Sequence, residues 1–123
     1  MPVNGRFGVP SDVAAVTANV TVRGADADGF VTVYPCGQAP PWASNLNYAE
    51  ATTVANLVTV QLGSGAFCVY STSAVHVVVD LLGWFGPGAP IVASTPARLA
   101  DTRPGAFTVD GLGAGGARPR CSR

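Results

Sequence analysis

Short runs of alternating apolar and polar residues constrain the fold of this chain more than any other feature. Within VAAVTANVTVR at residues 13–23, valine and alanine occupy the even positions from 16 to 22, and threonine and asparagine the odd ones. A two-residue period is that of a β-strand with one buried face. Nowhere does a dozen residues show the 3.6-residue period of an amphipathic helix. The sequence therefore predicts an all-β protein with little or no helix.

Further apolar segments follow, and glycine and proline separate them. The chain holds 15 Gly and 10 Pro, which is typical of a β-protein with many turns. The polar turn GADADG predicts a β-hairpin between the first two strands, and residues 91–105 add one or two short strands. We expect an antiparallel β-sandwich, or a jelly-roll-like fold, of about seven to nine short strands. The other strand segments are 30–36, 43–48 (short and irregular), 52–62, 66–71 and 75–85.

The strand pattern also suggests where the domain ends. A length of 123 residues is near the commonest size of a single domain. The sequence predicts one β-sandwich domain over residues 1–105. Residues 106–123 are rich in glycine and poor in apolar residues, so we expect them to be loosely ordered.

The charge balance argues against one class of partner. Seven arginines offset seven acidic residues, and the formal net charge is zero. A nucleic-acid-binding surface would need a basic patch, so no nucleic-acid partner is expected. The low charge also removes a common guard against self-association, which leaves a homo-oligomer open.

The apolar segments are too short for a membrane helix. The run at 75–85 is interrupted by His76 and Asp80, and a spanning helix needs about 20 apolar residues. No membrane insertion is expected. Residues 1–10 show no charged region followed by an apolar one, so no signal peptide is expected in this chain. A secreted protein with this sequence would have lost its leader.

The three cysteines favour an oxidising compartment. Cys36 ends one predicted strand and Cys68 opens another, a placement that suits a cross-strand disulfide. No CxxC or CxxH spacing occurs, so a metal site built on cysteine is disfavoured. Cys121 is left as a free thiol or, less favoured, as one half of an intermolecular disulfide.

A series of short motifs then resembles a known family. They occur in the order GVPSDVAAV, ANVTV, GFVTVYPCG, ASNLNY, VANLVTVQLGSGAFCVYS, HVVVDLLGWF and TPARLADTRPG. Together they resemble a β-rich module found in tandem, or as an appendage, in large secreted and cell-surface proteins of actinobacteria. The resemblance covers most of residues 8–105. It implies an extracellular or cell-surface accessory module without a settled activity of its own. In such proteins DTRPG usually precedes GVP, so the C-terminal part here resembles the start of a further repeat.

Several charged or titratable residues are candidates for a catalytic or metal site. His76 and Asp80 lie four residues apart on a strand, on one face and about 13 Å apart, too far for a catalytic pair without a bulge. A hydrolytic or metal site that adds Asp101 would need a second histidine or a nucleophile, and no G-x-S-x-G or HExxH motif occurs. We instead expect Asp80, Asp101 and Arg103 to be structural. Asp80 is predicted to be buried and bound by backbone N–H groups, Arg98 or Arg103.

The turn Asp26-Ala27-Asp28-Gly29 resembles the opening of a calcium loop. The carboxylate or amide ligands that should follow are missing before Cys36, so a solvated turn is the favoured interpretation. Calcium at Asp26 and Asp28 is therefore a weak alternative, and no other cofactor is expected.

The aromatic residues give the best functional lead. Trp42 lies in a proline-rich loop, and Asn45, Asn47 and Tyr48 follow it closely. Apolar sugar faces stack on aromatic rings while amides reach the hydroxyl groups. Trp84, at a strand end, either joins such a platform or, as we favour, closes the core.

These observations lead to three functional hypotheses. The first is a non-catalytic extracellular accessory module that binds a polysaccharide or cell-wall glycan. The second is a structural, self-assembling surface domain that acts through unpaired β-edges. The third and least favoured is a small hydrolase, because no catalytic constellation is evident.

Overall fold

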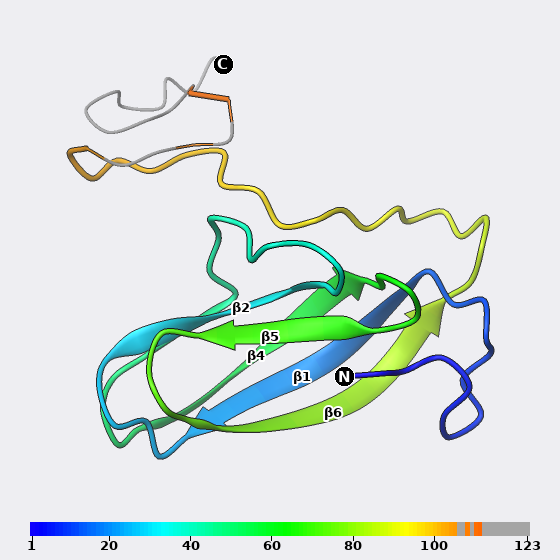
Figure 1. Cartoon of the computed structure of the whole chain (residues 1–123), viewed down its shortest axis with the longest axis horizontal. Coiled ribbons are helices and arrows are strands. Elements are labelled where there is room, and N and C mark those ends of the chain that lie inside the picture. The colour runs from blue at the N-terminus through cyan, green and yellow to red at the C-terminus, as the bar shows by residue number, and fades with distance from the viewer. Residues whose placement is uncertain (106–107, 109, 112–123) are drawn as a thin grey trace.

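The computed structural model describes residues 1–105, 108 and 110–111, and these residues form an all-β fold without a helix, as predicted (Figure 1). Among them no helix is long and apolar enough to cross a membrane. Six strands form, close to the predicted segments: β1 (Ala15–Arg23), β2 (Gly29–Pro35), β3 (Leu46–Tyr48), β4 (Thr53–Gln61), β5 (Phe67–Ser71) and β6 (His76–Phe85).

The strands form two antiparallel three-stranded sheets that pack face to face. The first sheet has the order β4-β1-β6 and the second has the order β3-β2-β5. β1 and β2 thus lie in different sheets, so the predicted hairpin across residues 24–29 is wrong. The connection instead passes from one sheet to the other, and Ala25 within it is buried. The Ala25 carbonyl accepts the Ala51 N–H at 2.9 Å, and the Asp26 N–H donates to the Ala74 carbonyl at 3.1 Å.

Residues 91–105 were expected to add one or two strands, and in the structure they add none. Figure 1 shows this segment running above the loop that joins β2 to β3. The Gln38 amide donates to the Thr95 hydroxyl at 3.0 Å and links the two. Pro90, Pro96 and Pro104 have no N–H to offer a sheet. The described residues therefore hold six strands, fewer than the expected seven to nine.

The alternation in β1 places its valines in the core. Val16, Val20 and Val22 are fully buried, while Thr17 and Asn19 on the other face are half-buried. Burying a valine side chain contributes about 1.5–3 kcal/mol, so this face is the main source of stability in the first sheet. Val58 and Val60 of β4 lie beside them in the same sheet. The facing core side chains come from the second sheet: Val31, Val33, Leu46, Tyr48 and Phe67.

The predicted disulfide between Cys36 and Cys68 is confirmed. Their Cα atoms lie 5.0 Å apart, and the bond closes a sequence separation of 32. It joins the end of β2 to β5 beside it and fixes the start of the loop that follows β2. Cys121 lies outside the described residues, as does most of the glycine-rich segment 106–123.

The sandwich is closed on one side and open on the other. On the closed side β4 contacts both β2 and β3. On the open side the register places Val77, Leu81 and Trp84 on the inner face of β6, opposite buried residues of β1. Their exposed fractions are nevertheless 38%, 39% and 45%. The inner face of β6 is therefore only partly covered, and Trp84 does not close the core, contrary to the expectation from the sequence.

Candidate functional site

The loop between β2 and β3 carries the most exposed tryptophan of the described residues. Backbone and side-chain bonds hold this loop against β2. The Asn45 N–H donates to the Val31 carbonyl at 2.9 Å, and the Val33 N–H donates to the Asn45 side-chain oxygen at 2.8 Å. The hydroxyl of Thr32, a fully buried residue, donates to the Ala43 carbonyl. These three bonds hold the loop on the C-terminal side of Trp42, while the Cys36–Cys68 disulfide fixes its start. The exposed fraction of Trp42 is 81%.

A cleft of about 610 Å³ opens beside Trp42. Its aromatic walls are Trp42, Phe30 of β2 and Tyr70 of β5. The Phe30 and Tyr70 rings lie 6.5 Å apart between centroids and are tilted by 56°. This volume lies within the range of small-ligand sites. A second cleft of about 480 Å³ lies along residues 95–98 and shares Pro41, Trp42 and Arg98 with the first, so the indole borders both clefts.

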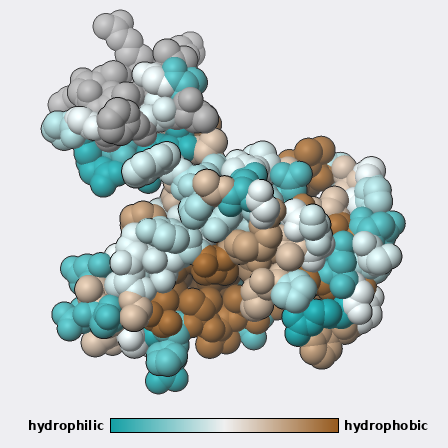
Figure 2. Space-filling view, in the orientation of Figure 1, coloured by the Kyte–Doolittle hydropathy of each residue, from teal (hydrophilic) through white to brown (hydrophobic). Residues whose placement is uncertain are grey.

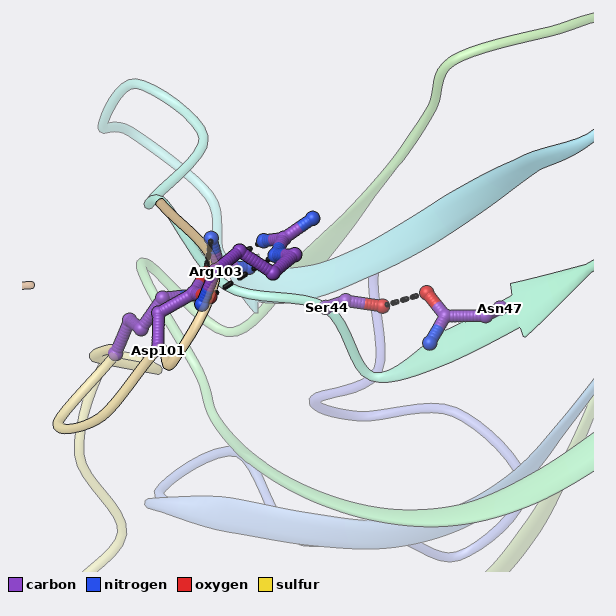
Figure 3. Close-up of polar contacts among 5 residues, drawn as sticks. Ser44, Asn47, Asp101 and Arg103 are labelled. Carbon is purple, nitrogen blue, oxygen red and sulfur yellow. Dashed lines mark hydrogen bonds and ion pairs between the residues drawn. The ribbon is translucent and has the colours of Figure 1, made fainter. Parts of the chain in front are cut away.

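Polar side chains complete the cleft: Ser44, Asn47, Arg98 and Arg103. The Ser44 hydroxyl donates to the Asn47 side-chain oxygen at 2.8 Å, which leaves the Asn47 NH2 group as a donor (Figure 3). Amides and guanidinium groups are hydrogen-bond donors suited to hydroxyl and carbonyl oxygens. The cleft therefore combines flat apolar surfaces with several donors.

Both cleft arginines are organised by Asp101. Arg103 Nε donates to Asp101 Oδ1 at 2.9 Å, and Arg103 Nη2 donates to Oδ2 at 2.5 Å, as Figure 3 shows. Arg98 Nη1 lies 3.2 Å from Oδ2. The side-chain and backbone hydrogen bonds from Arg103 hold the pKa of the Asp101 carboxyl well below its ordinary value, and the same pairing raises the pKa of Arg103. Two guanidinium groups share one carboxylate, so one positive charge remains beside the cleft.

The structure divides the predicted ligand-binding residues. Trp42 and Asn47 line the cleft. Asn45 instead holds the loop to β2, and Tyr48 is 5% exposed with its hydroxyl 2.8 Å from the Ser73 hydroxyl. Trp84 lies on β6 in the other sheet and is not part of the cleft.

The sequence interpretation missed two walls of the cleft. Phe30 and Tyr70 come from strands far apart in the chain, and the pairing of β2 with β5 brings them together. A signal was present in β2, where Phe30, Thr32 and Tyr34 alternate with core valines. That alternation places Phe30 on the outer face, although only the strand pairing identifies its neighbour.

The prediction that Asp80 is buried is wrong. Asp80 is exposed on the outer face of β6, opposite Asn19, and His76 is exposed opposite Arg23. This face of the first sheet is open to solvent, so a charge there needs no buried partner. Arg98 and Arg103, the expected partners of Asp80, bind Asp101 instead.

The two turn aspartates bind neighbouring loops. Asp26 Oδ1 accepts the Ala74 N–H at 3.1 Å, and Asp28 Oδ1 accepts the Glu50 N–H at 2.8 Å. The part of the chain that the structure describes holds no group of three or more histidine, cysteine or carboxylate side chains placed to bind a metal.

Comparison with models of known families, with curated proteins and with solved structures finds no match for this chain. The function is therefore argued from the cleft itself.

Proposed function

We propose that this domain is a non-catalytic, extracellular accessory module that binds a polysaccharide or cell-wall glycan in the cleft beside Trp42. The observation that carries the proposal is the position of Trp42: a loop fixed at its start by the disulfide and held to β2 just after Trp42 presents an 81% exposed indole that lines two clefts. An indole that contributes little to the core is available to stack on the apolar face of a sugar ring. Asn47, Arg98 and Arg103 supply donors for the hydroxyl groups of that sugar.

The chemistry of the cleft favours binding over hydrolysis. A glycosidase of the usual kind needs a pair of carboxyl groups, one of them with a raised pKa. The carboxylate beside this cleft, Asp101, is bound by two arginines, and its pKa is lowered. Such a carboxylate is a weak base and is occupied by its partners.

The extracellular part of the proposal is supported by the disulfide. Disulfides form and persist in oxidising compartments and are rare in the cytosol. The Cys36–Cys68 bond joins two strands of the second sheet. We also propose membership of the actinobacterial module family, on the seven ordered motifs of the sequence and the all-β fold.

A pull-down on a panel of insoluble polysaccharides and purified cell walls tests the proposal. The parent protein is expected to be retained by at least one of them. Trp42→Ala is expected to weaken that binding about tenfold or more, which corresponds to a loss of about 1.4 kcal/mol. Phe7→Ala is the matched control, because Phe7 is an exposed aromatic residue outside the cleft. The proposal would be overturned if Trp42→Ala bound as strongly as the parent protein, or if no glycan retained the parent protein.

A further inference from the structure

The open side of the sandwich leaves apolar surface uncovered. Figure 2 shows hydrophobic residues gathered on the side that carries β5 and β6. An apolar groove of about 150 Å³ lies there, lined by Phe67, Val79 and Leu81 and by the N-terminal segment. On β6 itself Val77, Val78 and Leu82 are exposed, Val77 on the inner face and Val78, which pairs with Thr21, on the outer face. Exposed apolar side chains gathered on one strand are typical of a protein–protein contact.

The strand that borders this side also has an unpaired edge. Within the described residues β6 pairs with β1 alone, so the N–H and C=O groups along its other edge have no strand partner. Edge strands are usually short or protected by charges, prolines or bulges. β6 spans His76–Phe85 and carries two charged or titratable residues, His76 and Asp80. A bulge at Leu82, where the register with β1 shifts, limits the regular edge to residues 76–81.

This regular edge is complementary to itself in one register. Two antiparallel copies related by a two-fold axis perpendicular to the sheet pair about a central residue. With Val78 at the centre, His76 lies opposite Asp80 of the second copy, and Asp80 lies opposite its His76. Both residues point to the outer face, as their partners in β1 show. On the inner face the same register sets Val77 against Val79 of the second copy.

The neighbouring registers place less favourable pairs of side chains opposite each other. Pairing centred on Val79 sets Asp80 against Val78, and pairing centred on Asp80 sets two carboxylates directly opposite each other. Like charges opposite one another destabilise a strand pair, whereas an imidazole opposite a carboxylate can donate a hydrogen bond to it. The zero net charge of the chain also lowers long-range repulsion between copies.

We propose that the open side of the sandwich is a homodimer interface, in which β6 pairs antiparallel with β6 of a second copy about Val78. The two first sheets then form one continuous sheet of order β4-β1-β6-β6-β1-β4. The contact covers inner-face Val77 and Leu81, whose exposure the monomer leaves unexplained. The Trp42 cleft lies on the second sheet and its loop, so the dimer presents two separate clefts.

Sedimentation of the full chain tests the association. The sedimenting mass is expected to rise with concentration to twice the 12.4 kDa of the chain. Val78→Lys, which places two ammonium groups at the two-fold axis, is expected to abolish the rise. Val78 is exposed, so this variant keeps its fold. A parent chain that stays monomeric up to millimolar concentration would overturn the proposal.

Cross-linking tests the register. In a Cys121→Ser background, Val78→Cys treated with a short bismaleimide is expected to yield a covalent dimer. Leu57→Cys is the matched control, because Leu57 is equally an exposed apolar residue but lies on β4, at the opposite edge of the same sheet. Equal yields from the two variants would refute pairing about Val78.

A charge exchange gives a second test of the register. Asp80→Lys is expected to shift the sedimenting mass back toward the monomer, because it removes the partner of His76. Adding His76→Asp is expected to restore the dimer, because aspartate then faces lysine across the interface. Residues 76 and 80 are about 13 Å apart within one strand, so the rescue cannot arise inside one chain. A double variant that stays monomeric would contradict the assigned register.

Discussion

Arg103 holds the carboxylate of Asp101 through two nitrogens, with Nε 2.9 Å from Oδ1 and Nη2 2.5 Å from Oδ2. The backbone N–H of Arg103 adds a third hydrogen bond to Oδ1 at 3.1 Å. The clamp is local in sequence, yet it contributes to the cleft, because it fixes the turn that follows Ala100 and holds Arg103 in the wall that also contains Trp42. Arg98 joins it from the same segment.

The clamp predicts how the cleft responds to acid. The hydrogen bonds from Arg103 lower the folded-state pKa of Asp101 from 3.8. A group with a depressed folded pKa stabilises the fold above its unfolded pKa, and this contribution is lost as the pH falls through the folded value. The cleft is therefore expected to stay intact from pH 7 to pH 4. A carboxyl ¹³C NMR titration is expected to give Asp101 a midpoint below 3.8, and Arg103→Gln should move it upward. A midpoint at or above 3.8 in the parent would contradict the clamp.

The buried hydroxyl of Thr32 predicts a link between the core and the Trp42 loop. Thr32→Val keeps the shape of the side chain but leaves the Ala43 carbonyl without its donor. An unsatisfied buried polar group costs about 1–3 kcal/mol, and here the loss falls on the loop that carries Trp42. We expect a lower free energy of unfolding together with weaker glycan binding. Thr17→Val is the control, because the Thr17 hydroxyl contacts that of Thr59 on the exposed face of the first sheet. The free energy of unfolding measured in urea should change by less than about 0.5 kcal/mol in this variant.

The positions of the strands can be predicted from the sequence, whereas the pairing between them cannot. The segments between glycine and proline turns located all six strands, and alternation identified the buried face most clearly in β1. It did not identify strand partners: β1 and β2 follow each other in sequence, yet their valine faces pack across the core instead of pairing edge to edge. The same limit hid the contact between Phe30 and Tyr70, which depends on the pairing of β2 with β5.

The residues of the candidate site also differ in how far the sequence predicts their roles. Trp42 and Asn47 are predicted from their nearness in sequence and line the cleft, whereas Asn45 binds the backbone of β2 and Tyr48 is buried. The role of Tyr48 depends on which face of β3 meets the core, and a three-residue strand is too short to show a period. Asp80 was predicted to be buried because its neighbours are valines, but those valines lie at a sheet edge whose outer face is open.

Two glycines make a matched pair for testing the close approach of the loops beside the disulfide. A Cβ added at Gly63 would lie 2.0 Å from the backbone oxygen of Cys36, whereas a Cβ at Gly83 would meet nothing within 4 Å. Gly63→Ala must therefore displace backbone, and overpacking of this kind costs about 1–3 kcal/mol. Gly83→Ala is expected to leave the free energy of unfolding unchanged or slightly raised. Thermal unfolding of the two variants checks this, and equal melting temperatures would contradict the described packing around Cys36.

The Cys36–Cys68 bond predicts both a thiol count and a stability change. In denaturant without reductant, one thiol per chain is expected to react, because Cys121 remains when the other two are paired. Three are expected after reduction, and a Cys121→Ser variant should show none before it. In the chain-entropy model, opening a loop of this length costs about 3–4 kcal/mol. Urea unfolding of the reduced protein, followed by circular dichroism, should show that loss in the free energy of unfolding. Three reactive thiols in the unreduced protein would refute the pairing.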